Sequence, residues 1–344
     1  MRRRVLAAWL ILVIAVVACS VPNSDRATKE VLETAVARLT EATGAVPPAT
    51  EGPTAPAETE PPPPTPTLAA LLATEEPTRA AASGRELLEQ VMAAGKLVVS
   101  TDPNYAPQSF LNSAGELDGF DVDVAKQVAQ RMGVQVEFVT PDWDLVAAAN
   151  WEGRWDVSIG SMTPTAERAE ILWFTAPYYY TPASFAVHKD NTTIQTVDDL
   201  AGKKVGLGMA TTYEAYLQGS LSLMGGEIVY PAPAGVKIWQ YLTDAEALDD
   251  LELGDGVRVD AVMTSKTTIQ ADIDEGQPIK YLGIPAFYEP LAFALDKGRG
   301  PADEMLNRLN EIIDDMHADG TLSELSIKWY GIDRTRVIRP EEQP

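Results

Sequence analysis

Residues 97–101 read Leu-Val-Val-Ser-Thr, and residues 121–132 read Asp-Val-Asp-Val-Ala-Lys-Gln-Val-Ala-Gln-Arg-Met. The first stretch is a short apolar run typical of a buried strand, and the second has apolar residues at helical spacing on one face. Further apolar strands are predicted at 134–140 and 157–162. This alternation of strands and helices predicts an α/β fold in which helices cover a sheet.

The same alternation returns further along the chain, which predicts a second lobe of similar build. Strands are expected at 204–208, 227–230 and 257–264, with helices at 211–223 and 238–253. The chain then closes with a strand at 290–295 and with helices at 301–318 and around 322–329. We expect two α/β lobes rather than one very large sheet.

The N-terminus has the features of an export signal. Three arginines at 2–4 precede an apolar run at 5–18, which is shorter than the roughly 18 to 20 residues that a spanning helix needs. The run ends in Val-Val-Ala-Cys at 16–19, which resembles a bacterial lipobox, and Cys19 is the one cysteine of the chain. We predict a signal peptide at 1–18 and lipidation of Cys19. The alternatives are a plain signal peptide with an incidental cysteine and an N-terminal anchor helix.

A proline-rich segment separates this signal from the body. Residues 47–67 contain nine prolines and five threonines. Such a composition favours an extended chain that cannot bury a core, with a reach of roughly 65 Å at ~3.1 Å per residue. We therefore predict a lipid-anchored Pro/Thr-rich stalk over 19–84, with a short amphipathic helix at 28–40, and a C-terminal tail at 335–344.

The composition excludes several classes of partner. Among 344 residues, 27 Lys and Arg stand against 50 Asp and Glu, and a formal charge of −23 repels the phosphates of nucleic acids. One cysteine allows no internal disulfide, and two histidines, His188 and His317, leave little for a metal site. Neither a phosphate-binding glycine loop nor a nucleophile motif is present. We expect no nucleic-acid partner, no metal and no cofactor.

Polar residues follow the predicted strands, at the edge where open α/β sheets bind ligands. The loop at 160–168 offers Ser161 and Thr163 as hydrogen-bond donors, and Arg168 can hold a carboxylate with two parallel hydrogen bonds. Each candidate also has a structural alternative. Arg168 can pair with a neighbouring glutamate on the surface, Trp143 can lie in the core, and Thr212 can serve the start of a helix.

Motifs spread over residues 95–329 resemble those of one family. They are Gly-Lys-Leu-Val-Val at 95–99, Gly-Phe-Asp-Val-Asp-Val-Ala at 119–125, Thr-Ala-Glu-Arg at 165–168, Phe-Thr-Ala-Pro-Tyr at 174–178, Gly-Lys-Lys-Val-Gly at 202–206, Gly-Thr-Leu at 320–322 and Lys-Trp at 328–329. Together they resemble the bacterial family 3 solute-binding proteins, the polar amino acid receptors of ABC importers.

The resemblance implies the type II periplasmic-binding-protein fold, with two α/β lobes joined by a two-stranded hinge and the ligand between them. Lobe 1 would comprise 91–186 and 288–334, and lobe 2 would comprise 187–287. Arg168 matches the arginine that binds the ligand's α-carboxylate. Its expected helpers are Ser161, Thr163 and, from lobe 2, Thr212, while the ligand side chain would meet Asp102, Tyr105 and the aromatic wall of Trp143.

One departure from the family concerns the ligand's ammonium group. Amino acid binders of this family usually place an aspartate five residues after the position of Asp260, and here that position is Ser265. Ser265 can accept a hydrogen bond but adds no charge, so an amino acid would lose a contact of roughly 1.5 to 3 kcal/mol unless Asp102, Glu289 or another acid compensates. A glycine that is frequent in the family is also replaced, by Ala210.

We therefore expect a monomeric receptor outside the cytoplasm, held at the membrane by lipidated Cys19. It would bind a small carboxylate-bearing solute, a polar amino acid, by closure of its lobes, and pass it to the permease of an ABC importer. We do not expect an enzyme. Two alternatives stay open: a ligand-sensing receptor domain, and a lyase similar to cyclohexadienyl dehydratase that would use Glu289.

Overall fold

The computed structural model describes residues 85–336. The predictions for the signal peptide, Cys19, the helix at 28–40 and the whole stalk over 19–84 lie outside these residues, as does the tail beyond 336. Within 85–336, every helix is too short or too polar to cross a membrane.

A nine-stranded sheet runs through both lobes. Its strands are β1 (Lys96–Ser100), β5 (Gln135–Val139), β6 (Val157–Met162), β7 (Leu172–His188), β8 (Lys204–Gly208), β9 (Glu227–Ile228), β10 (Lys237–Tyr241), β11 (Ala261–Ser265) and β12 (Ile279–Asp296). The strand order is β10-β8-β11-β7-β12-β6-β1-β5, with β9 paired to β12 beside this path.

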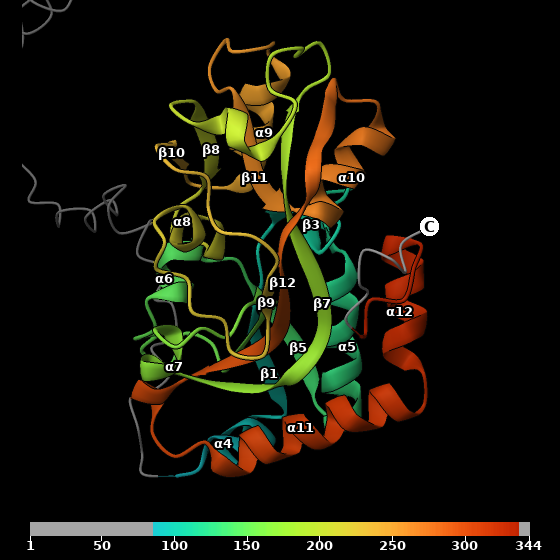
Figure 1. The fold of residues 1–344 in the computed structure, drawn as a ribbon. Coiled ribbons are helices and arrows are strands. Elements are labelled where there is room, and N and C mark those ends of the chain that lie inside the picture. Colours follow the sequence, from blue (N-terminus) through green and yellow to red (C-terminus); the bar gives the residue numbers. More distant parts are fainter. Residues whose placement is uncertain (1–84, 337–344) are drawn as a thin grey trace, which may run out of the picture. The chain divides into compact units, whose positions relative to one another are not determined.

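The long strands β7 and β12 connect the two lobes. They pair antiparallel from one lobe into the other, as the long green and orange arrows in Figure 1 show. In lobe 1, β12 pairs with β6, and in lobe 2, β7 pairs with β11. These two strands are the hinge of a mixed α/β fold of the type II periplasmic binding class. Residues 183–186 of β7, which come before the predicted boundary at 187, already pair with β11 of lobe 2. The lobe boundaries at 187 and 288 stay a prediction.

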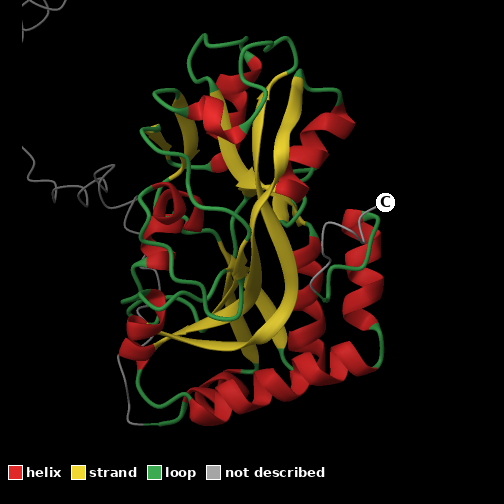
Figure 2. Cartoon of the chain, in the orientation of Figure 1, coloured by secondary structure: helices red, strands yellow, loops and turns green. Residues whose placement is uncertain are grey.

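Lobe 1 packs helices on both faces of its half of the sheet (Figure 2). Leu97 and Val99 face a core that is shared with α5 and α11, whereas Val98 faces a second core with Trp151 and Trp155. This alternation is the two-residue period of a strand that is buried on both sides. The helices are α4 (Leu87–Ala94), α5 (Phe120–Met132), α6 (Trp143–Ala147), α7 (Arg168–Ile171), α11 (Asp303–Ala318) and α12 (Thr321–Tyr330), and a small separate sheet consists of β2 (Asn104–Tyr105), β3 (Ser109–Leu111) and β4 (Leu117–Asp118).

Lobe 2 repeats this arrangement with its own two cores. Leu207 and Phe185 lie in one core, and Val262 and Leu248 lie in the other. The helices are α8 (Thr212–Leu217), α9 (Asp244–Glu252) and α10 (Lys266–Glu275), with a short 3-10 turn at Val197–Leu200.

The helix predicted at 238–253 is wrong. Residues 237–241 form β10, and α9 begins only at Asp244. The Thr243 side chain accepts a hydrogen bond from the Glu246 backbone N–H, and the Glu246 carboxylate accepts one from the Leu242 N–H. Thr243 is thus the N-cap of α9, and the Glu246 side chain holds the residue before it, so the helix starts here and is separated from the preceding strand. The helix predicted at 211–223 is also too long, since α8 ends at Leu217.

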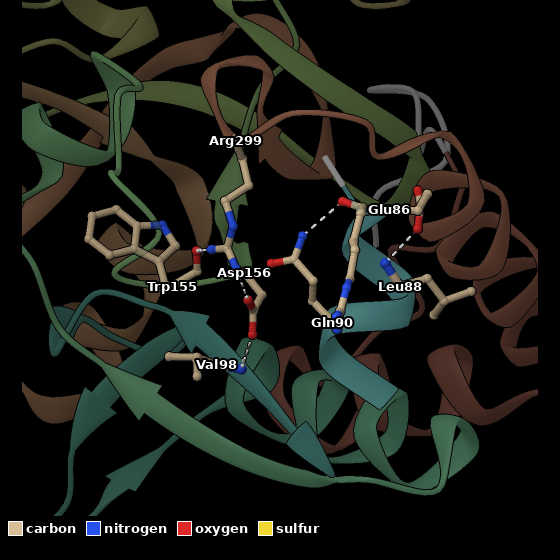
Figure 3. A network of polar contacts seen from close by, with 8 residues as sticks. Glu86, Leu88, Gln90, Val98, Trp155, Asp156 and Arg299 are labelled. Carbon is tan, nitrogen blue, oxygen red and sulfur yellow. Dashed lines mark hydrogen bonds and ion pairs between the residues drawn. The ribbon is translucent and has the colours of Figure 1, made fainter. Parts of the chain in front are cut away.

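A buried ion pair fixes the end of the hinge strand β12 in lobe 1 (Figure 3). Arg299 Nη2 lies 3.0 Å from Asp156 Oδ1, and the two side chains are 8% and 0% exposed. Asp156 Oδ2 also accepts the Val98 N–H at 2.9 Å, and Arg299 Nη1 donates to the Trp155 carbonyl at 3.0 Å. The pair thus joins β1, the start of β6 and the turn after β12.

Candidate functional site

A pocket lies between the two lobes, next to the hinge. Its empty volume, which includes space open to solvent, is about 520 Å³. Seven of the eight predicted ligand-binding residues line it: Asp102, Tyr105, Trp143, Ser161, Thr163, Arg168 and Thr212. The eighth, Ser265, does not line it. The binding role of each of the seven stays a prediction.

Arg168 presents a buried guanidinium group to this pocket. It is the first residue of α7 and is only 9% exposed, and burial lowers its pKa. Its Nη1 donates to the Thr163 carbonyl at 3.0 Å, and its Nη2 donates across the lobes to the Ala210 carbonyl at 2.8 Å. These bonds use two of the five N–H donors of a guanidinium, so donors are left for a ligand carboxylate.

Ala210 brings the backbone of lobe 2 against this arginine. The Ala210 carbonyl also accepts a hydrogen bond from Trp143 Nε1 at 3.3 Å, and the Arg168 guanidinium carbon lies 5.4 Å from the centre of the Trp143 ring. Ala210 has a φ of 58°, a left-handed conformation that glycine adopts without strain. The alanine therefore keeps the conformation for which the family's glycine is suited.

Glu289 is a hinge residue that the two threonines of the site share. Thr163 Oγ1 donates to Glu289 Oε2 at 2.6 Å from lobe 1, and Thr212 Oγ1 donates to the same atom at 2.8 Å from lobe 2. Glu289 is 1% exposed, and burial raises its pKa, whereas the two hydroxyl donors and Arg168 act in the opposite direction. The hydroxyl protons of both threonines are thus directed at the protein's own carboxylate.

Ser161 reaches the pocket but its hydroxyl points into lobe 1. Its Oγ donates to Asp121 Oδ2 at 2.7 Å and lies 2.6 Å from the Tyr179 hydroxyl. Tyr178 donates to the other Asp121 oxygen at 2.6 Å. Asp121 is fully buried, and burial raises its pKa to about 7. This network holds Ser161 in its positive-φ conformation at the pocket floor.

Asp102 and Tyr105 line the pocket from the other side of lobe 1. Asp102 Oδ1 accepts the Asn104 N–H at 2.7 Å, and burial raises the pKa of Asp102. The Tyr105 hydroxyl lies 3.0 Å from the Tyr213 hydroxyl of lobe 2. Asp102 is therefore both a turn residue and a carboxylate at the pocket.

Ser265 is the buried N-cap of α10. Its side chain accepts a hydrogen bond from the Thr268 N–H and, across the lobes, from Gln108 Nε2 at 3.2 Å. It is 0% exposed. The hydroxyl at this position thus serves the start of a helix and the contact between lobes.

The sequence interpretation missed Asp244, a third acid of the pocket lining. Asp244 is the first residue of α9, follows the N-cap Thr243 and is 7% exposed. Burial raises its pKa to about 6. The Thr-x-x-Glu sequence at 243–246, which is typical of a helix N-terminus, would have placed it shortly after a strand, at the edge of the sheet where ligands bind. Three carboxylates and one guanidinium therefore line the pocket.

A strap from lobe 2, residues 222–224, crosses to the loop before Arg168. The Ala166 N–H donates to the Ser222 carbonyl and the Met224 N–H donates to the Pro164 carbonyl, each at 3.0 Å. Thr165 and Leu223 form an antiparallel bridge between these bonds. Backbone of lobe 2 thus holds part of the loop that carries the arginine. Within 85–336, no group of three or more His, Cys, Asp or Glu residues is arranged to hold a metal ion.

Two lobes on a two-stranded hinge, with a buried arginine and three acids in the pocket between them, define a two-lobed binding protein for small polar molecules. Residues 97–332 match the model of the bacterial extracellular solute-binding proteins, family 3. The chain belongs to this family.

Proteins that are similar to this chain support its membership of the family. The chain is 33% identical to the L-cystine-binding protein TcyJ of Escherichia coli (strain K12) over 73% of its length and 88% of the relative's. It is 30% identical to the histidine-binding periplasmic protein of Salmonella typhimurium (strain LT2), over 69% of its length and 88% of the relative's. The crystal structure of the ancestral amino acid-binding protein AncCDT-1, a precursor of cyclohexadienyl dehydratase, is similar with a TM-score of 0.61 and 32% identity, covering 71% of this chain and 99% of that one.

Proposed function

We propose that this protein is the amino acid receptor of an ABC importer and that it binds its ligand's α-carboxylate through Arg168. The observation that supports this most is the position of the Arg168 guanidinium, which is buried in the interlobe pocket with donors to spare. A desolvated guanidinium forms strong, paired hydrogen bonds with a carboxylate. The relatives named above, which bind amino acids, support the same ligand class.

Glu289 is the group that would receive the α-ammonium in place of the aspartate missing at 265. It lies on the hinge beside Thr163 and Thr212, and its charge interacts with that of Arg168. A carboxylate and a guanidinium in one pocket match the two charges of an amino acid's head group. Because Thr163 and Thr212 come from different lobes, this head group would be bound fully only when the lobes meet.

The proposed location of the receptor rests on the export signal predicted at its N-terminus. Lipidation of Cys19 would hold it on the outer side of the cell membrane, and the stalk would let the two lobes reach a permease in that membrane. We propose that it acts as a monomer, because the pocket is completed by two lobes of one chain. A shorter stalk would lower transport into cells without changing affinity for the ligand, and this comparison tests the arrangement.

The experiment for the binding site is calorimetric titration of the full chain with a panel of amino acids. We expect Arg168→Ala to raise the Kd of the bound amino acid at least ~30-fold, which corresponds to about 2 kcal/mol. Arg154→Ala is the matched control, because Arg154 also lies against a tryptophan ring, at 5.2 Å, but outside the pocket lining. Equal affinities of the wild type and Arg168→Ala would refute the assignment.

A lyase is the second candidate, and it rests on Glu289 alone. A buried carboxylic acid with a raised pKa can act as a general acid. However, the two hydroxyl groups that donate to Oε2 favour the ionised form of Glu289. Such a carboxylate is better suited to bind a cation than to donate a proton. Formation of product from prephenate or arogenate would establish the lyase, and binding without turnover supports the receptor.

A further inference from the structure

The pocket has more negative than positive groups. Asp102, Asp244 and Glu289 line it together with a single cation, Arg168. The α-carboxylate and α-ammonium of an amino acid cancel each other, so a ligand with only these charges leaves the excess of acid uncompensated. A buried carboxylate without a nearby positive charge is costly.

Of the three acids, Asp244 shows most clearly that a positive partner is lacking among the residues that the structure describes. Its Oδ1 accepts the Gly208 N–H and its Oδ2 accepts the Thr264 hydroxyl, each at 2.7 Å. None of the ion pairs within residues 85–336 includes it. A carboxylate offers about four lone-pair sites, so two remain for a donor in the pocket.

Asp102 approaches Asp244 from the opposite lobe. Both acids line the same pocket, Asp102 after β1 of lobe 1 and Asp244 at the start of α9 of lobe 2. Burial is the first cause of the raised pKa of Asp244, and the charge of Asp102 contributes to it. Two like charges therefore oppose each other across the pocket when the lobes are together.

We propose that the ligand carries a second cationic group, which lies between Asp102 of lobe 1 and Asp244 of lobe 2. The substrate class is then the cationic amino acids. This inference rests on the proposed function, since Arg168 and Glu289 hold the head group and leave the two aspartates for the side chain. The cation favours the closed state because only there does it contact both carboxylates.

The test compares L-lysine with L-norleucine, which has the same chain length but no ε-ammonium. Calorimetric titration of the full chain near neutral pH should show lysine binding about tenfold to a hundredfold more tightly. In Asp244→Asn the preference should fall to about threefold or less. Asp249→Asn removes the same charge from an exposed position on the same helix and should keep the full preference.

A second readout uses the wild type alone, in case Asp244→Asn does not fold. The groups that face Asp244 are Asp102, Glu289, Tyr105 and Tyr213. Burial raises the pKa of both tyrosines, so they stay neutral in acid, and Glu289 would contact the α-ammonium that both ligands share. Lowering the pH through about 6, where Asp244 takes up a proton, should therefore reduce the ratio of the two affinities.

The outcomes separate this inference from the proposed function. If norleucine binds as tightly as lysine while Arg168→Ala abolishes both, the receptor stands and the cation site is refuted. If lysine is preferred equally by the wild type and by Asp244→Asn, Asp244 is not the partner of the cation. If no amino acid binds, the proposed function itself fails.

Discussion

Replacing Arg299 by methionine should destabilise lobe 1 strongly, because it removes the guanidinium that pairs with the buried carboxylate of Asp156. Asp156 is 0% exposed and has Arg299 Nη2 3.0 Å from Oδ1, so the carboxylate cannot turn to water when the guanidinium is removed. Breaking a pair of this kind costs about 3 to 5 kcal/mol. For a protein of this size the melting temperature falls about 2 to 4 °C per kcal/mol, which predicts a decrease of roughly 6 to 20 °C.

The assay is thermal unfolding of the full chain followed by circular dichroism. Arg308→Met is the control, since Arg308 pairs with Glu311 at 3.2 Å between side chains that are 36% and 66% exposed. An exposed pair of this kind contributes less than about 1 kcal/mol. In Asp156→Asn/Arg299→Met both charges of the ion pair are removed, and the neutral amide still accepts the Val98 N–H, so part of the loss should be recovered (Figure 3). If Arg299→Met costs no more than Arg308→Met, the reasoning from burial is wrong.

Two further predictions concern buried polar groups near the pocket. The pKa of Asp121 is raised from 3.8 to about 7, so its protonated form stabilises the fold at low pH and this contribution is lost as the pH rises through about 7. In urea unfolding from about pH 4 to about pH 8, Asp121→Asn should therefore show a flatter profile than the wild type, and parallel profiles would contradict this. Ser265→Ala removes the N-cap of α10 and should lower the unfolding free energy by about 1 to 2 kcal/mol. Ligand affinity should change by about threefold or less, and a larger loss would show that Ser265 does contact the ligand.

The fold could be predicted from the sequence where short apolar runs alternate with amphipathic helices. The strands at 157–162 and 204–208 have the predicted bounds, because continuous apolar runs are typical of strands buried on both faces. The secondary structure of the segment 238–253 could not be predicted in the same way. Apolar residues continue from β10 into α9, and only the Thr-x-x-Glu sequence at 243–246, typical of a helix N-terminus, marks the change from strand to helix.

The candidate site could be predicted only in part from the sequence. Asp102 comes soon after β1, and Arg168 comes at the end of the loop that follows β6, so both could be placed at the sheet edge by their position alone. What the hydroxyls do could not be foreseen, because the partner of Thr163 and Thr212 is Glu289, about 126 and 77 residues further along the chain. Asp244 was missed because the helix was predicted to begin too early.

The strap at 222–224 gives the protein a way to adjust its affinity without altering the pocket lining. Its two backbone hydrogen bonds to residues 164–166 join lobe 2 to lobe 1, so separation of the lobes would break them and their free energy would add to that of ligand binding. A change in how easily residues 219–226 reach lobe 1 would alter the fraction of molecules that are closed, and with it the apparent Kd for every ligand by the same factor. Selectivity and affinity can therefore evolve at separate positions, the first in the pocket lining and the second in a segment that does not line it.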